Sequence, residues 1–113
     1  MDEQLEQEVS LLHDKICQGI AAPKRILILY ALRKQPRRVR ELAEAMNMPQ
    51  PTLSRHLKIL RDRSLVAANR EGTSVTYSLA EPEIVEALDI MRGVLRSILR
   101  RESNMVLPSG ASE

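Results

Sequence analysis

The sequence has almost no aromatic residues and a single cysteine. Its 113 residues include two Tyr but no Trp or Phe, so the core must be built from aliphatic side chains and Met. One cysteine, Cys17, excludes a disulfide within the chain. No apolar run is long enough to cross a bilayer, and the first residues lack the basic and then apolar stretch of a secretory signal. These absences predict a small cytoplasmic protein that is not associated with a membrane.

Positive charge is concentrated in the middle of the chain. Residues 24–70 hold twelve Lys and Arg against three acidic residues, a net charge of +9, whereas residues 1–23 carry −4 and residues 71–113 carry −3. Clustered Lys and Arg are typical of proteins that bind a polyanion. A solvated basic surface without a partner would give the same composition, so charge alone does not decide between the two.

Apolar residues recur at helical spacing in five segments. We expect helices over residues 3–20, from Pro23 to before Pro36, around residues 39–46, from Pro51 to near Ser64, and from near Pro82 onward. The first and last helices each carry an apolar stripe, formed by Leu5, Val9, Leu12 and Ile16 and by Ile84, Leu88, Met91, Leu95 and Ile98. The second stripe has heptad spacing, which is typical of a helix that packs along another helix.

Between the fourth and fifth predicted helices, residues 65–69 and 74–79 have the composition of short strands, with Gly72 in the turn that joins them. The resulting order is four helices, two strands and a helix. It predicts a mainly α fold with a small β-hairpin, a winged helix-turn-helix, over residues 1–102. Residues 103–113 contain Ser, Gly and Pro, and we expect them to form a disordered tail.

Residues 39–60 have the pattern of a helix-turn-helix that reads DNA. Asn47 is suited to the tight turn because asparagine tolerates the left-handed conformation, and Leu53 packs the second helix onto the first. The exposed face of that second helix presents side chains that bind base edges and phosphates, namely Gln50, Thr52, Ser54 and Arg55. Arginine can read guanine with two hydrogen bonds, and glutamine can read adenine in the same way.

Several segments together resemble the arsenic-repressor (ArsR/SmtB) family of winged-helix regulators. The likeness lies in PQPTLSRHLKILRD at 49–62, then LV at 65–66, REGT at 70–73 and YSL at 77–79, with APKRILIL at 22–29 similar to the family's second helix. It covers about residues 11–100 and is most specific in the middle.

The resemblance implies a homodimer built on the first and last helices that binds a palindromic operator and represses transcription. It implies that Gln50, Ser54 and Arg55 face the groove and that Arg70 and Thr73 belong to the wing. Thr52, Arg38 and Lys58 complete the expected set of DNA-contacting residues. His56 is interpreted as a residue that braces its helix against the backbone or a phosphate, rather than as a base reader.

The sequence departs from the family where many members bind metals. Arg38 and Arg40 stand at the positions of two cysteines, and a guanidinium has no lone pair to offer a cation. The last helix contains Asp89 but no histidine, so the second kind of family metal site is also missing. We therefore expect no cofactor and neither of these metal sites, and the effector is left open.

The sequence leaves two alternative functions open and argues against an enzyme. His13 and Cys17 are four residues apart and are zinc-type ligands, so a thiol-, redox- or metal-responsive repressor is one alternative; a lone cysteine beside an apolar stripe is more often a small buried hydrophobic residue. The second alternative is a winged-helix protein that binds only other proteins. The sequence lacks the convergent acids, bases and phosphate loops of an enzyme, and we expect no catalytic activity.

Overall fold

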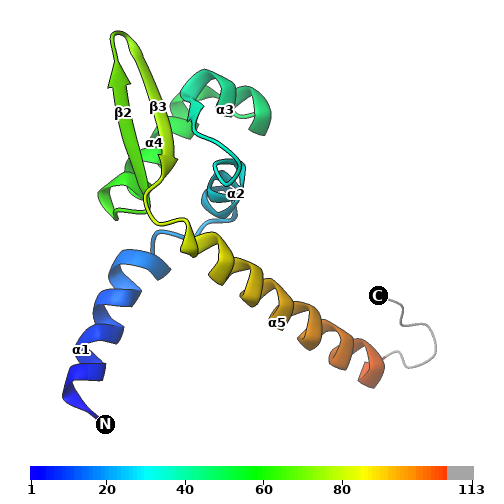
Figure 1. The fold of residues 1–113 in the computed structure, drawn as a ribbon. Helices are drawn as coiled ribbons and strands as arrows, with labels where there is room; N and C mark the ends of the chain where they lie inside the picture. Colours follow the sequence, from blue (N-terminus) through cyan, green and yellow to red (C-terminus); the bar gives the residue numbers. More distant parts are fainter. Residues whose placement is uncertain (107–113) are drawn as a thin grey trace. The chain divides into compact units, whose positions relative to one another are not determined.

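The computed structural model describes residues 1–106 (Figure 1), and its contacts divide the chain into a unit of residues 1–82 and a second unit that begins at Glu83. The first unit contains, in order, α1 (Glu3–Leu12), the π-helical turn η1 (His13–Cys17), α2 (Pro23–Ala31), β1 (Arg37–Arg38), α3 (Val39–Met46), α4 (Gln50–Asp62), β2 (Val66–Glu71) and β3 (Ser74–Leu79). The described part of the second unit is one helix, α5 (Glu83–Val106).

The turn between α3 and α4 depends on one left-handed residue. Asn47 has φ 51° and ψ 50°, and its N–H and that of Met48 donate to the carbonyl oxygens of Glu44 and Ala43 at 3.2 and 3.0 Å. These bonds satisfy carbonyl groups that the end of a helix leaves without partners. Pro51 lies in the first turn of α4, where a missing N–H has no cost. The predicted helix-turn-helix is confirmed at these positions.

The core of the first unit is entirely aliphatic, as the composition predicted. Its buried side chains come from α2, α3, α4 and the start of the hairpin: Ile28, Leu29, Leu32, Leu42, Leu53, Leu57, Leu60, Leu65 and Val66. Leu53, Leu57 and Leu60 lie on one face of α4 because they recur at helical spacing. That packing fixes α4 against α2 and α3 and leaves its opposite face in solvent.

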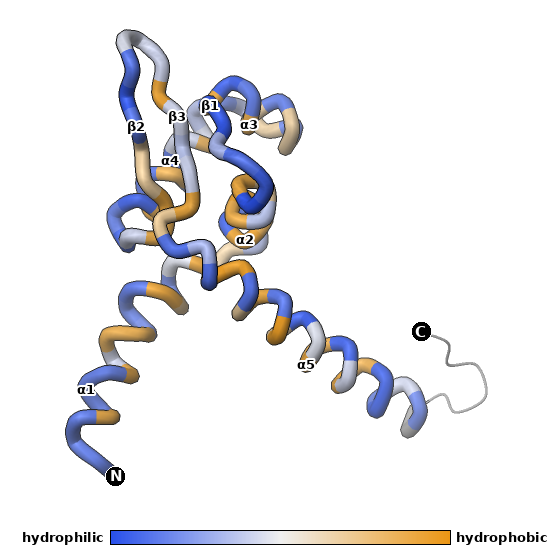
Figure 2. Tube along the Cα trace, viewed as in Figure 1, coloured by the Kyte–Doolittle hydropathy of each residue, from blue (hydrophilic) through white to orange (hydrophobic). Residues whose placement is uncertain are grey.

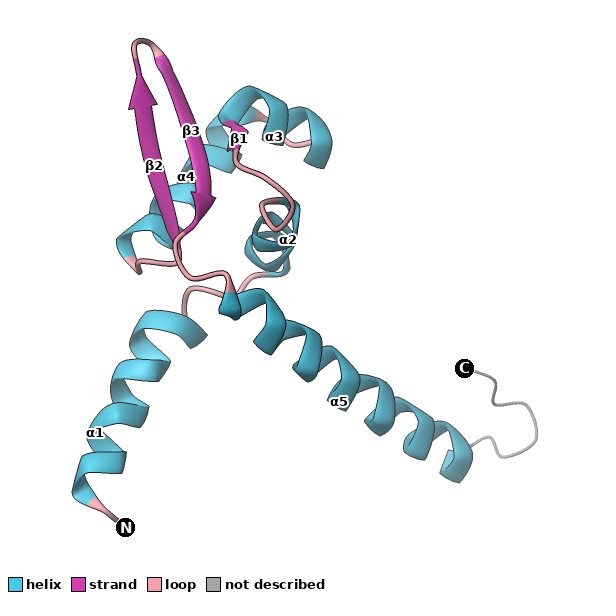
Figure 3. Ribbon diagram, in the orientation of Figure 1, coloured by secondary structure: helices cyan, strands magenta, loops and turns pink. Residues whose placement is uncertain are grey.

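The sheet has three antiparallel strands in the order β1-β3-β2, one more than the sequence predicted (Figure 3). β2 and β3 form the hairpin, with Ala68 opposite Tyr77 and Glu71 opposite Ser74. Gly72, at φ 62°, is the permissive residue of a turn that is tighter than predicted, since residues 70 and 71 belong to β2. A helix-turn-helix followed by such a hairpin is a winged helix, which confirms the predicted fold class.

β1 was missed because two charged residues carry no strand pattern of their own. It is defined by its pairing, with Arg37 opposite Tyr77 and Arg38 opposite Thr76. The strand is followed directly by α3, so it connects the start of the helix-turn-helix to the central strand of the wing. Such a pairing depends on residues almost forty positions apart and is not visible in a local pattern.

The first helix differs from the expected span of residues 3–20. Its α-helical part ends at Leu12, and the N–H of Gln18 then donates to the carbonyl of His13 at 3.0 Å, which closes one π-helical turn. A π turn inserts an extra residue into the helix and changes the face on which the following side chains lie.

A second unexpected feature is Ser64, which has φ 65° at the end of α4.

Apolar side chains are exposed along α1 and α5, and hydrophobic segments recur along both helices (Figure 2). Of the predicted stripes, Leu5, Val9, Leu12, Met91 and Leu95 are between 43% and 51% exposed. Ile16, Ile84 and Ile98 are half-buried, and Leu88 is only 3% exposed within the single chain. Ile90, Val94 and Leu99 are also exposed, so the apolar surface of α5 is broader than the predicted seam.

α5 continues to Val106, four residues beyond the expected domain boundary at residue 102. The rest of the expected tail, residues 107–113, lies outside the described residues. Within residues 1–106, no helix has the length and apolar character needed to span a membrane.

Candidate nucleic-acid interface

The two faces of α4 differ sharply in burial. Its leucines are 0% exposed, whereas Gln50, Ser54 and Arg55 are exposed on the first turns of the helix and Thr52 is half-buried. Gln50, Ser54 and Arg55 therefore have the exposure that the sequence predicted, whereas Thr52 is partly buried. These side chains carry both donors and acceptors, which is what the edges of base pairs in a major groove require. Their contact with DNA stays a prediction.

Two of the expected DNA-contacting residues already have partners on α4 itself. Arg55 donates from Nη2 to the hydroxyl of Thr52 at 3.4 Å, and Lys58 Nζ lies 3.0 Å from Oδ2 of Asp62. Both contacts are exposed and are worth little in water. They hold the two cations near the helix surface, and a phosphate or base edge can replace either partner.

The wing adds exposed polar residues near the hairpin turn. Arg70 is exposed at the end of β2, and Thr73 is exposed beside Gly72. Arg38 is exposed at the end of β1, the strand that neighbours β3 in the sheet. The structure thus brings Arg38 close to the wing, although 32 residues separate it from Arg70 in the sequence.

His56 is half-buried on α4 and contacts Arg25 of α2. Arg25 Nη1 lies 3.3 Å from His56 Nδ1, and the same guanidinium donates to the carbonyl oxygens of Gly19 at 2.6 Å and Gln18 at 3.2 Å. Burial, and then the nearby charges of Arg25, Arg55 and Lys24, lower the pKa of His56 below its ordinary value. His56 braces α4, as expected, but its partner is an arginine rather than the backbone or a phosphate.

A second arginine also contacts the end of the first helical segment. Arg63, just after α4, donates to the carbonyl of Asp14 and to Oε1 of Gln18. Gly19 lies so close to Leu65 that an added Cβ would come within 2.8 Å of its Cδ1. Sequence reasoning missed Arg25 and Arg63, because their partners are backbone carbonyls and side chains far away in the sequence, which leave no local pattern.

Cys17 is exposed in the single chain, so the core of one chain does not bury it as a small hydrophobic residue. His13 is also exposed, and its Nδ1 lies 3.8 Å from Oδ1 of Asp14. Within residues 1–106, no group of three or more His, Cys, Asp or Glu side chains is placed to hold a metal ion.

Residues 22–68 match the family model described as "Bacterial regulatory protein, arsR family". The uncharacterized HTH-type transcriptional regulator Rv0081 of Mycobacterium tuberculosis is 40% identical over 81 residues, which cover 71% of each chain. The chain belongs to the arsR family of bacterial regulatory proteins. The crystal structure of Rv0081 has a TM-score of 0.70 at 31% identity and covers 90% of this chain and 98% of that one.

One further relative in sequence and one further solved structure are also similar to this chain. The HTH-type transcriptional regulator NmtR of M. tuberculosis is 42% identical over 72 residues, or 64% of this chain, and the chain spans only 60% of the length of NmtR. The homodimeric winged helix-turn-helix domain Mb0332 of Mycobacterium bovis has a TM-score of 0.74 at 25% identity over 89% of this chain and 93% of that one. These relatives are named as regulators and not as enzymes. This agrees with the expectation that the chain has no catalytic activity.

Proposed function

We propose that this chain is a transcriptional repressor that binds duplex DNA sequence-specifically as a homodimer on a palindromic operator. The observation that carries the proposal is the exposed face of α4, where Gln50, Ser54 and Arg55 project near a wing that carries the exposed Arg70. A helix with such side chains fits a major groove, which is wide enough for a helix and displays a different pattern for each base pair. Membership of the arsR family supports the same assignment.

The homodimer is supported by the unpartnered apolar surfaces of the two terminal helices. Large aliphatic side chains that are about half exposed along a 24-residue helix are costly to leave in water. The M. bovis relative is described as homodimeric. A two-fold dimer carries two copies of α4 and matches an operator with inverted half-sites about 10 base pairs apart.

We further propose that this repressor works without the family's usual metal sites. Arg38 and Arg40 cannot coordinate a cation, and α5 contains no histidine. A Cys17-dependent response is a second candidate, favoured by the exposure of its thiol.

Selection from a pool of random duplexes tests the proposed function. The purified chain is expected to enrich an inverted repeat and to bind it at least a thousandfold more tightly than random duplex at one fixed salt concentration. The affinity should fall steeply with salt, because phosphate contacts release counterions. A protein that bound no duplex, or whose weak binding showed no sequence preference, would instead fit the alternative of a protein-interaction module.

A further inference from the structure

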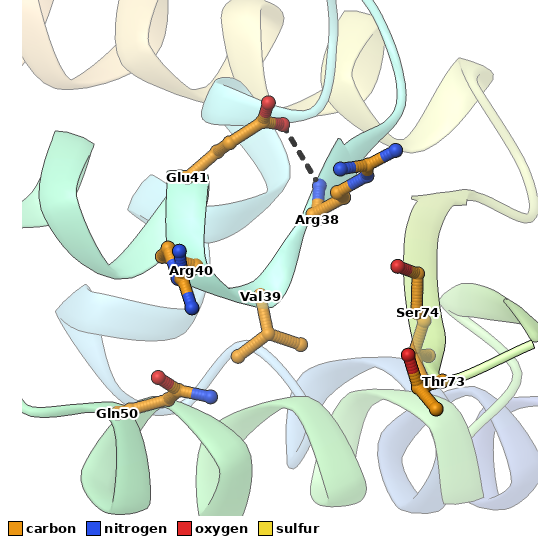
Figure 4. Close-up of a pocket in the computed structure, with 8 residues that line it drawn as sticks. Arg38, Val39, Arg40, Glu41, Gln50, Thr73 and Ser74 are labelled. Atoms are coloured by element: carbon orange, nitrogen blue, oxygen red, sulfur yellow. Dashed lines mark hydrogen bonds between the residues drawn. The ribbon is translucent and has the colours of Figure 1, made fainter.

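A cavity of about 540 Å³ lies between the helix-turn-helix and the wing (Figure 4). It is lined by the end of β1 and the start of α3, by the first residue of α4, and by the start of β3. Val39 lies between its two sides: Arg40 and Gln50 are on one side, and Thr73 and Ser74 are on the other. The volume is within the range of about 300–1,000 Å³ in which proteins hold small ligands.

The lining of this cavity is rich in donors for an anion. Arg38 and Arg40 bring two guanidinium groups, and both residues are exposed. The one acidic neighbour, Glu41, accepts a hydrogen bond from the backbone N–H of Arg38 at 3.1 Å through Oε1. The amide of Gln50 and the hydroxyls of Thr73 and Ser74 add neutral donors. The cavity therefore has two cations against one carboxylate.

The position of the cavity matches the path of a DNA strand. Under the proposed function, α4 enters a major groove, and we expect the wing to lie over the adjoining minor groove. Those two grooves are separated by a sugar-phosphate backbone, so one strand has to cross the protein between α4 and the wing. The cavity is the space between the first residue of α4 and the start of β3, where that crossing is expected.

We propose that this cavity is a phosphate site, in which Arg38 and Arg40 bind the phosphodiester backbone that passes between the two grooves. The inference rests on the proposed function and adds Arg40 and Ser74 to the expected contacts. Arginine suits the role because its planar guanidinium can donate two parallel hydrogen bonds to one phosphate. The pairing of Arg38 with Thr76 holds the start of the site against the wing strand.

Charge removal at the cavity is the first test. Arg38→Gln and Arg40→Gln keep a donor and remove the charge, and Arg61→Gln is the matched control because Arg61 is exposed on the last turn of α4. We expect each cavity variant to weaken the selected and the random duplex by a similar factor and to lower the salt slope by about 1. We expect the control to do neither, and all three to keep the wild-type melting temperature.

Neutral methylphosphonate, placed at one phosphate of the selected half-site at a time, locates the contact. We expect wild type to lose affinity at the phosphates between the major groove protected by α4 and the minor groove protected by the wing. Arg40→Gln should lose much less at those positions and as much as wild type elsewhere. An identical pattern for the two proteins, together with wild-type affinity and salt slope, would overturn the assignment.

A titration with inorganic phosphate tests whether the site binds free phosphate as well as the phosphates of a DNA strand. In a titration at constant ionic strength against chloride, displacement of DNA that is specific to phosphate and abolished by Arg40→Gln would support a site that also accepts free phosphate. Equal displacement by both anions, with the methylphosphonate result above, would support the DNA strand alone. Failure of wild type to bind any duplex would refute the proposed function, whereas normal DNA binding by both cavity variants would refute only the phosphate site.

Discussion

Arg25 on α2 donates to Nδ1 of His56 on α4, with 3.3 Å between the nitrogen atoms. An imidazole can accept at Nδ1 only when it is neutral and carries its proton on Nε2. The same guanidinium also binds the carbonyls of Gln18 and Gly19. One side chain therefore joins the turn after η1 to the helix that we propose reads DNA, and the joint depends on the protonation state of His56.

The first prediction concerns pH. The pKa of His56 is lowered in the folded chain by burial and then by Arg25, Arg55 and Lys24, so the unfolded chain binds a proton more readily. The stabilisation is present above the unfolded pKa of about 6.5 and is lost as pH falls below it. We expect the melting temperature to fall between pH 7 and pH 5, and to fall less steeply in His56→Gln, which keeps an acceptor. Equal slopes in the two proteins would contradict the prediction.

The second prediction concerns base recognition. Arg55→Ala should cost about 1–3 kcal/mol of affinity for the selected operator and relax the preference at one base pair. The fold should persist, because Arg55 is exposed and its only described partner is Thr52. A gel-shift titration against operator and random duplex measures both effects. Arg61→Ala removes the same charge six residues further along α4 and should leave the base preference intact; the same loss in both variants would mean that Arg55 is not a base reader.

The third prediction concerns the wing. Arg70 is exposed near the hairpin turn, and we expect it to lie on a phosphate or in the flanking minor groove. Arg70→Ala should weaken operator and random duplex alike and lower the salt slope by about 1. The exposed Arg96 of α5 offers a charge-matched control. A loss confined to one operator sequence would make Arg70 a base reader instead.

The elements that could be predicted were those with a strong pattern of their own. Leu53, Leu57 and Leu60 define the buried face of α4, so the exposed face that carries Arg55 followed from helical spacing. β1, the π turn at His13 and the contacts of Arg25 depend on partners distant in sequence or on backbone carbonyls. For the same reason, the proximity of Arg40 to the wing had to come from the tertiary structure.

The fourth prediction concerns the dimer. Leu88 is an unsuitable probe because it is 3% exposed in the single chain, so a charge there would also damage the fold. Leu95 is 51% exposed, and Leu95→Glu should give a folded monomer, since the carboxylate would be buried only in the dimer. Light scattering over a range of concentrations measures this, with Arg96→Glu as the neighbouring control. A variant that remained dimeric would place the interface elsewhere.

The fifth prediction concerns Cys17, the one cysteine of the chain. Zinc, cadmium, nickel and arsenite at near-stoichiometric levels should not release DNA through Arg38 and Arg40 or through α5. Any release by a soft metal or an oxidant should disappear in Cys17→Ser, which should bind DNA like wild type without effector. A gel-shift assay with and without the agent decides this, and release that persisted in Cys17→Ser would reveal a different sensor site.

The pairing of β1 with β3 has a consequence for which operators are chosen. Because β1, which leads directly into α3, is hydrogen-bonded to the wing strand β3, we expect the protein to hold its proposed DNA-contacting residues at a fixed spacing. The DNA would then bend, twist or change its groove width to fit, and the energy of that deformation depends on its base steps. Preferred operators should therefore share flexible steps at positions that no side chain touches.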